Sequence, residues 1–196
     1  QSPSRSAFDV FAFEPGRRSI LQATWRASTL ATGGNVKGVF EISGNSRYDD
    51  AITERYHFPS NYLSVARELV SDWIVYRETR VSGGRMAYIA AAFVERIDAD
   101  PSDPSHFYAR VRDYLEFDQP VPYRDGSGRF AEQFLREMAK PGDAGRSLRG
   151  KSVRGLEDED FVAIVNAGLA ETLDPVNRIR GFRRSEEHTS ELQSHS

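Results

Sequence analysis

Hydrophobic and polar positions follow changing rhythms along the chain, and these rhythms mark the first predicted elements. A short strand is predicted at 39–42, where apolar residues stand before a Ser-Gly-Asn-Ser turn. Apolar positions then recur at helical spacing over 62–69, which predicts a helix. That helix is expected to start near Pro59, which suits a first turn, and to end near Val70.

The middle of the chain is predicted to form a sheet. Residues 73–76 are β-branched and aromatic throughout, which favours a strand. The polar stretch that ends in Gly83-Gly84 predicts a hairpin connection, with 86–94 as the return strand. A further strand is predicted at 107–111. The segment 120–123 is expected at a sheet edge, because neither of its prolines can donate to a ladder.

The last third of the pattern predicts two helices with a basic segment between them. The first helix is short, at 130–138, and the second is clearer, at 158–167, with acidic residues in its first turn and an apolar stripe. Between them, 145–155 is the densest basic run in the chain. The whole pattern predicts an α+β fold: a curved, mostly antiparallel sheet that approaches a barrel, with two or three helices.

One ordered domain is expected, at 37–170, between segments of a different character. Residues 1–36 are poorly patterned and are interpreted as a loose N-terminal extension. Residues 171–183 contain the chain break Asp174-Pro175 and are interpreted as a linker, and the stretch from Ile179 to Arg184 is short and basic. Residues 184–196 resemble the translation of a sequencing-library adapter, so they are treated as an artefact tail and excluded from fold reasoning.

Composition narrows the classes of function. At 196 residues, 39% hydrophobic and 28% charged, the chain fits a soluble globular protein, and no apolar run is long enough to span a bilayer. No membrane partner is therefore expected. The absence of cysteine excludes a disulfide framework and fits a cytoplasmic location. The net charge of −3 supports a nucleic-acid binder only if the arginines gather on one face.

No complete catalytic site is predicted. Outside the tail only His57 and His106 remain, and neither has a recognisable metal-ligand spacing. Asp49-Asp50 is more typical of a turn or a helix cap than of a cation site. No phosphate-cradling glycine loop and no Ser-His-Asp set can be argued for. We therefore expect no catalytic residue, no metal site and no cofactor in this chain, and we interpret His57 as structural.

Aromatic residues gather between positions 48 and 88, and they predict a base-binding cleft beside the sheet. A base flipped from a duplex is held by stacking between aromatic faces and by hydrogen bonds to its polar edge. The edge contact is assigned to Asn61 or Asp50. Each aromatic also fits a core position, and that alternative stays open. The residues that could supply the faces are Tyr48, Tyr56, Phe58, Trp73, Tyr76 and Tyr88.

Basic residues supply the candidate phosphate contacts. Phosphates bind by charge without reading sequence, so a cluster of arginines is sufficient for this role. A solvated loop is the alternative for the run at 145–155. The candidates are Arg85, Arg146, Arg149, Lys151 and Arg154.

These stretches resemble the N-terminal half of a group of bacterial HNH endonucleases. The resemblance runs from Lys37 to about Ala170, about two thirds of the chain. Ser71 is a departure, since the family usually has glycine before Asp72. The resemblance is carried, in order, by Tyr48-Asp49-Asp50, Arg55-Tyr56-His57-Phe58-Pro59, Tyr62-Leu63, Asp72-Trp73-Ile74-Val75-Tyr76, Gly83-Gly84-Arg85, Tyr88, Tyr114-Leu115-Glu116-Phe117-Asp118, Pro120-Val121-Pro122, Gly145-Arg146-Ser147 and Arg154.

In that family this half resembles an EVE-type domain of the PUA-like superfamily, a twisted β-barrel with flanking helices. Related domains read modified bases, such as methylated or hydroxymethylated cytosine, flipped from the duplex. The resemblance thus implies a module that binds modified DNA and directs an HNH restriction nuclease. The pocket candidates that it implies are Tyr48, Asp50, Tyr56, Asn61, Trp73 and Tyr88.

The resemblance also sets what this chain is expected to lack. The adapter-like tail begins before any HNH motif, so the chain alone is expected to be non-catalytic. A divalent metal is expected only for the HNH part. A homodimer stays open. The alternatives are an RNA- or small-ligand-binding PUA-like domain, and a scaffolding domain whose aromatics are all core.

Overall fold

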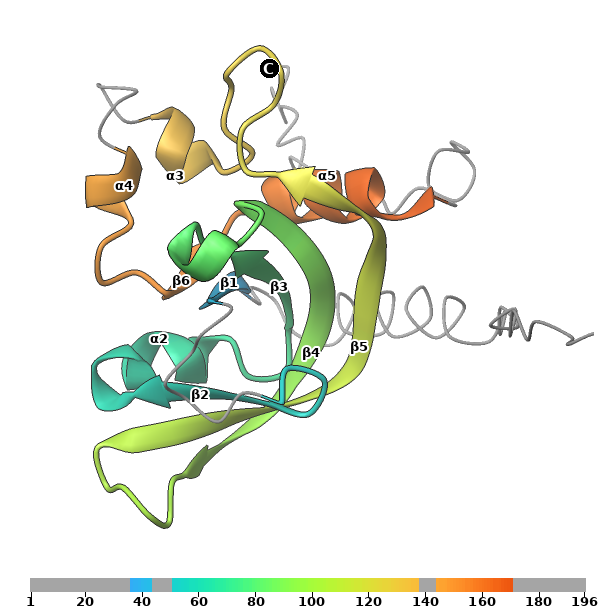
Figure 1. Cartoon of the computed structure of the whole chain (residues 1–196). Helices are drawn as coiled ribbons and strands as arrows, with labels where there is room; N and C mark the ends of the chain where they lie inside the picture. The colour runs from blue at the N-terminus through green and yellow to red at the C-terminus, as the bar shows by residue number, and fades with distance from the viewer. Residues whose placement is uncertain (1–35, 44–50, 138–143, 171–196) are drawn as a thin grey trace, which may run out of the picture. The chain divides into compact units, whose positions relative to one another are not determined.

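A curled, six-stranded mixed sheet organises the residues that the computed structural model describes, which are 36–43, 51–137 and 144–170 (Figure 1). The strand order is β2-β5-β4-β3-β1-β6. β1 and β3 run parallel, and the other neighbouring pairs are antiparallel. The strands are β1 (Lys37–Ile42), β2 (Arg55–Pro59), β3 (Trp73–Glu78), β4 (Ala87–Ala99), β5 (His106–Pro122) and β6 (Val153–Leu156).

Short helices cover both faces of this sheet. Leu69, just after α2, packs with Ile74 in the hydrophobic core on one face, whereas α5 packs against β5, β4 and β1 on the other. α2 also contacts β6, so it lies over the curl of the sheet. The helices are η1 (Ser60–Tyr62), α2 (Leu63–Glu68), η2 (Val81–Gly83), α3 (Gln133–Arg136), α4 (Ala144–Ser147) and α5 (Asp158–Gly168).

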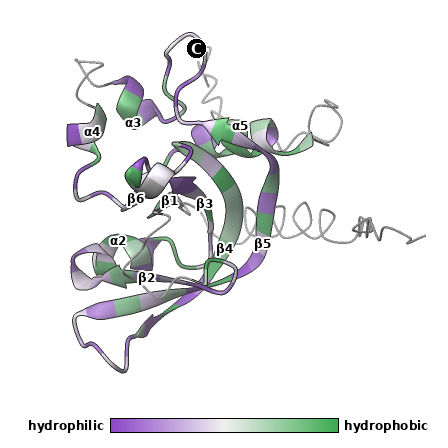
Figure 2. Ribbon diagram, viewed as in Figure 1, coloured by the Kyte–Doolittle hydropathy of each residue, from purple (hydrophilic) through white to green (hydrophobic). Residues whose placement is uncertain are grey.

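Because each strand alternates its side chains, the sheet buries two different sets of residues. We call the two sides the aromatic face, which includes Phe40 and Tyr76, and the α5 face, which includes Val75 and Trp73. All four of these residues have no exposed surface. The middle of β4 is hydrophobic in Figure 2, as burial on both faces requires.

The predicted α+β class and the curled sheet are confirmed. The predicted strands at 39–42, 73–76 and 86–94 and the helix at 158–167 all form, with small extensions. The two segments expected at 107–111 and 120–123 belong to a single strand, β5. β2 pairs only with residues 106–110 of β5. The other end of β5, which carries Pro120 and Pro122, therefore lies at an open edge in the described part of the chain, as expected.

Two strands were not predicted, and one predicted helix is shorter. Residues 55–59 and 153–156 form the edge strands β2 and β6. β6 lies within the basic run, whose charges indicated an exposed segment. The helix expected at 130–138 is confined to Gln133–Arg136. Both β6 and this short helix depend on partners far away in the sequence, which periodicity does not reveal.

Two glycines allow close packing that a Cβ atom would block. At Gly84 a Cβ would lie 1.9 Å from the carbonyl oxygen of Thr79, so the β3–β4 connection folds back tightly on itself. At Gly168 a Cβ would lie 2.5 Å from the ring of Phe117, so α5 approaches β5 closely. The first glycine fixes the hairpin and the second fixes the helix on the sheet.

Ser71 adopts a left-handed backbone conformation in the turn before β3, with φ of 67°. This conformation crowds Cβ against the backbone in every residue except glycine. We expect Ser71→Gly to raise the free energy of unfolding by about 0.5–1 kcal/mol, since the relief of strain exceeds the added flexibility of the unfolded chain. Urea unfolding measures this. A variant less stable than the parent would contradict it, and exposed Ser64→Gly in α2 is the control, expected to destabilise.

Candidate nucleic-acid interface

Four aromatic rings form a continuous cluster on the aromatic face. Phe40 of β1 stacks on Tyr56 of β2, with ring centroids 4.5 Å apart. Tyr76 of β3 lies 6.1 Å from Phe40 and 6.3 Å from Tyr56. Tyr114 of β5 adds a fourth ring, 6.0 Å from Tyr76. Phe40, Tyr56 and Tyr76 are buried, whereas Tyr114 is partly exposed, so this ring carries the cluster to the surface.

A β-bulge directs Tyr114 to this cluster. Arg112 pairs with Phe93 and Leu115 pairs with Ala91, so β5 has one more residue than β4 across this interval. Asp113 lies in the bulge with φ of 53°. Arg112 lies over the ring of Phe93 on the α5 face, 4.1 Å from its centroid. Without the extra residue, Tyr114 would point to that same face, because alternate residues share a face.

An ion pair lies close enough to Tyr114 to act on its hydroxyl. Arg85 donates two hydrogen bonds to the carboxylate of Glu78, at 2.7 and 2.8 Å. Hydrogen bonds from Arg85 lower the pKa of Glu78, and the same pair raises the pKa of Arg85. Burial raises the pKa of Tyr114, and the charges of Glu116, Arg85 and Glu78 also act on its hydroxyl. A partly exposed aromatic ring is therefore combined with an ionised carboxylate and a guanidinium.

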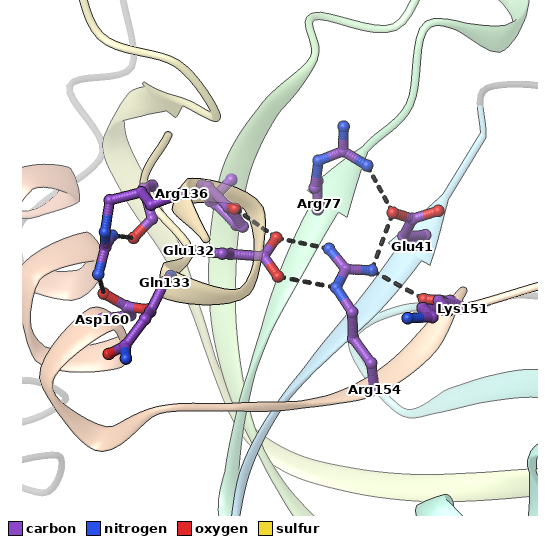
Figure 3. Close-up of polar contacts among 10 residues, drawn as sticks. Glu41, Arg77, Glu132, Gln133, Arg136, Lys151, Arg154 and Asp160 are labelled. Carbon is purple, nitrogen blue, oxygen red and sulfur yellow. Dashed lines mark hydrogen bonds and ion pairs between the residues drawn. The ribbon is translucent and has the colours of Figure 1, made fainter. Parts of the chain in front are cut away.

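A network of four buried charges lies on the α5 face of the same strands (Figure 3). Arg154 of β6 grips Glu132 with two hydrogen bonds, at 2.6 and 2.8 Å. It also donates to Glu41 of β1, at 2.9 Å. Arg77 of β3 donates to the same Glu41 oxygen, at 2.5 Å. Two arginines and two glutamates thus balance one another where β1, β3 and β6 lie side by side.

Tyr88 extends this network, and its electrostatics indicate a fixed protonation state. Its hydroxyl donates to Glu132 at 2.6 Å. Burial and the charge of Glu132 raise the pKa of Tyr88 well above its usual range, so the phenol keeps its proton. Burial alone would raise the pKa of Glu132, but hydrogen bonds from Arg154 and Tyr88 and the charge of Arg77 outweigh it and lower that pKa.

A second set of contacts attaches α3 to α5. Asp160 of α5 accepts a hydrogen bond from the guanidinium of Arg136 at 2.7 Å and one from the backbone amide of Gln133 at 2.5 Å (Figure 3). Arg136 also donates to the carbonyl of Ala131 at 2.6 Å. The segment around α3 is therefore held from both sides, by Glu132 to the sheet and by Asp160 to the helix.

The predicted pocket residues do not converge on one place. Tyr56 belongs to the aromatic cluster, and its hydroxyl donates to the carbonyl of Glu41 at 2.8 Å. Trp73 lies on the α5 face, edge-on to Phe93 at 5.8 Å. Tyr88 lies on that face too, within the charge network.

Asn61 stands apart from these residues. Asn61 is exposed in η1, just past the end of β2 that pairs with His106. Tyr114 lies eight residues further along β5, about 25 Å along the strand. Tyr48 and Asp50 lie outside the described residues. Trp73 and Tyr88 have no exposed surface, so we assign both to the core. Within the aromatic cluster, Tyr114 provides the accessible ring.

The predicted phosphate contacts divide into an exposed and a buried group. Arg146, Arg149 and Lys151 are exposed along α4 and the turn after it. Lys151 places its amine 4.0 Å from the ring centroid of Phe134, an exposed aromatic residue of α3 that the sequence did not single out. Arg154, in contrast, is buried and its guanidinium is used in the network, so we reassign it to a structural role.

The described residues provide stacking surfaces and charge. His57 places Nε2 2.9 Å from Asp100 and stacks on Tyr108 at 4.5 Å, which agrees with a structural histidine. Within 36–43, 51–137 and 144–170, no three His, Asp or Glu side chains are placed to hold a metal ion. None of the described helices combines the length and apolar character of a transmembrane span.

Comparisons with known proteins find solved structures that are similar at low sequence identity. No protein-family model matches the sequence, and no curated protein matches it. A protein from Rhodopseudomonas palustris is 13% identical, with 68% of this chain and 92% of that chain covered and a TM-score of 0.45. A protein from Agrobacterium tumefaciens is 14% identical, with 69% and 94% covered and a TM-score of 0.44. The N-terminal domain of Staphylothermus marinus McrB is also 14% identical, with 67% of this chain and 94% of that domain covered and a TM-score of 0.46.

Proposed function

We propose that residues 36–170 form a DNA-binding module that recognises a modified cytosine flipped out of the duplex. The observation that carries this proposal is the partly exposed ring of Tyr114, which rests on a buried aromatic cluster beside the Glu78–Arg85 ion pair. A flipped base needs an aromatic surface for stacking and polar groups for its edge. Both are present here within one small region of the aromatic face.

The ion pair has the chemistry to recognise the edge of cytosine. Cytosine presents an amine that donates to a carboxylate, next to ring atoms that accept hydrogen bonds. The carboxylate of Glu78 is ionised, and its two oxygens have about four acceptor positions, of which Arg85 uses three through its guanidinium and its backbone amide. Glu78 would accept from the amine and Arg85 would donate to the neighbouring acceptors. Arg85, first considered as a phosphate contact, therefore becomes an edge contact in this proposal.

The DNA backbone would lie along the exposed basic segment after α4. Arg146, Arg149 and Lys151 supply positive charge, and Phe134 supplies an exposed ring among them. Phosphate groups bind to such residues without regard to sequence, and aromatic rings add stacking that tolerates any base. The buried Arg154–Glu132 contact positions this segment relative to the sheet.

The sequence resemblance supports the remaining part of the proposal, that the module directs an HNH nuclease to modified DNA. In this proposal the described residues supply recognition, and cleavage resides in a separate domain of the intact protein. We therefore propose that binding by this chain needs no metal ion, and that the divalent metal belongs to the nuclease domain.

Binding to matched duplexes tests the proposal. The duplexes carry one cytosine, one 5-methylcytosine or one 5-hydroxymethylcytosine at the same position. We expect about 5- to 150-fold tighter binding to at least one modified duplex, the usual worth of one well-recognised base pair. The preference should persist in EDTA. Fluorescence anisotropy measures the affinity, and a fluorescent base analogue opposite the modified cytosine reports flipping.

Four outcomes would argue against this function. Equal affinity for all three duplexes would exclude base recognition, and so would the absence of binding. A stronger preference for modified RNA than for modified DNA would instead support the RNA-binding alternative. Loss of the preference in EDTA would show that a metal ion takes part in recognition.

A further inference from the structure

Three arginines lie side by side on the neighbouring strands β2, β5 and β4, at the end of the sheet opposite β6. Arg110 of β5 pairs directly with Arg55 of β2 and with Arg96 of β4. Tyr56 follows Arg55 and Ala109 precedes Arg110, and both belong to the hydrophobic core on the aromatic face. Because neighbouring residues of a strand point to opposite faces, the arginines lie on the side that faces away from that core. Arg112 follows on the same face of β5. Figure 1 shows β2, β5 and β4 together.

This row of like charges opposes the stability of the sheet. Like charges directly opposite each other on paired strands are destabilising. Asp98 partly relieves the repulsion, since it accepts hydrogen bonds from Arg110 at 2.8 Å and from Arg96 at 3.2 Å. Glu95 pairs with Arg96, and Asp113 pairs with Arg112. Arg55 and Arg110 are half-buried and Arg96 and Arg112 are exposed, so the row presents positive charge to a partner with negative charge.

Neighbouring rings hold the guanidinium groups in place. Tyr108 lies two residues before Arg110 in β5, on the same face of the sheet. The guanidinium carbons of Arg55 and Arg110 both lie 5.3 Å from the ring centroid of Tyr108. His57 stacks on the same ring at 4.5 Å. Guanidinium groups held against an aromatic ring lose less freedom when they bind a phosphate. Arg96 and Arg112, at 56% and 43% exposure, complete the surface.

We propose that the face formed by Arg55, Arg96, Arg110 and Arg112 is a second phosphate-binding surface, which holds the backbone of duplex DNA. The inference rests on the proposed DNA-binding function. The four side chains span two strand spacings by one two-residue repeat, about 10 Å by 7 Å, which is enough for several phosphate groups. The ion pairs of Arg96 with Glu95 and of Arg112 with Asp113 are exposed, and such pairs contribute little, so a phosphate can replace these carboxylates.

The test removes the two most exposed charges together, as Arg96→Gln with Arg112→Gln in the full chain. Binding to an unmodified duplex is measured over a series of salt concentrations. Each phosphate contact contributes about −0.9 to the slope of log affinity against log salt, so the slope should become shallower by about 2. At low salt the affinity should fall about 10-fold or more. The preference for modified cytosine should not change.

A matched control is the pair Arg67→Gln and Arg129→Gln, which removes the same charge from exposed positions elsewhere. If the control changes the slope equally, net charge explains the loss and the surface is excluded. An unchanged slope in the test variant, or a loss seen with duplex RNA but not with DNA, also overturns the inference. A wild-type chain without base preference, whose salt slope still depends on Arg96 and Arg112, would overturn the proposed function alone.

Discussion

Replacement of Arg154 by methionine is expected to lower the free energy of unfolding by about 3–5 kcal/mol, the usual cost of removing one partner from a buried ion pair. Arg154 is buried and donates to both Glu132 and Glu41. Without it, the carboxylate of Glu132 stays buried, and among the described residues the hydroxyl of Tyr88 remains as its side-chain donor. Total stabilities of domains are about 5–15 kcal/mol, so urea unfolding should show a large shift.

Two variants separate the lost charge pair from a general effect of the substitution. Arg149→Met changes an exposed arginine of the same segment and should be nearly neutral. Glu132→Gln combined with Arg154→Met removes both charges and should recover part of the loss, because the unpaired carboxylate is then absent. A double variant as unstable as Arg154→Met alone would contradict this explanation and would indicate lost packing.

The effect of Arg154→Met should also depend on pH in a definite direction. In the parent chain the pKa of Glu132 is lowered, so its contribution to stability is present above the unfolded pKa and is lost as pH falls through the folded pKa. In the variant, burial is opposed by fewer partners and should raise that pKa, which reverses the sign. The difference in unfolding free energy between the two proteins should therefore be largest near neutral pH and shrink below the ordinary glutamate range, near pH 4.5.

The limits of sequence reasoning about the fold are clearest in β2 and β6. Arg55, Tyr56, His57 and Phe58 do alternate as a strand should, with Tyr56 and Phe58 buried. The helix start predicted at Pro59 follows these residues directly and competes with that alternation as a sequence signal. β6 is harder to predict, because Arg154 in the sequence alone indicates an exposed basic segment. Its contacts with Glu132 and Glu41 become visible only in the folded structure. The pairing of charges over such distances in sequence is a property of the tertiary structure alone.

Sequence reasoning about the candidate site is limited for a related reason. Aromatic composition predicted a base-binding cleft with Tyr56 and Tyr76 among its possible faces. These two rings do lie in one cluster, but composition did not distinguish the two faces of the sheet. Trp73 alternates with Ile74 and so points to the opposite face, where it is fully buried with Phe93 against its ring. Tyr114 would also be assigned to that opposite face by strict alternation with Arg112. The bulge at Asp113 reverses this, and the left-handed aspartate that makes it has no sequence signal as strong as glycine.

Tyr114→Ala is expected to abolish most of the preference for modified cytosine. Stacking of a base on an aromatic residue is worth about 1–3 kcal/mol, so affinity for the modified duplex should fall roughly 5- to 150-fold. Tyr114 is the member of the aromatic cluster that reaches solvent among the described residues, so its removal takes away the accessible ring and leaves the buried ones. Anisotropy titrations with the modified and unmodified duplexes give the ratio of affinities directly.

Two further variants determine whether the loss comes from stacking at this position. Tyr114→Phe keeps the ring and should retain the preference, because the proposed role needs no hydroxyl. Tyr108→Ala removes a partly buried tyrosine from the other face of the same strand, so it should leave the ratio of affinities unchanged even if overall affinity falls. If Tyr114→Ala keeps the parental ratio while it remains folded, the flipped base is held elsewhere, and the aromatic face is then a core without a recognition role.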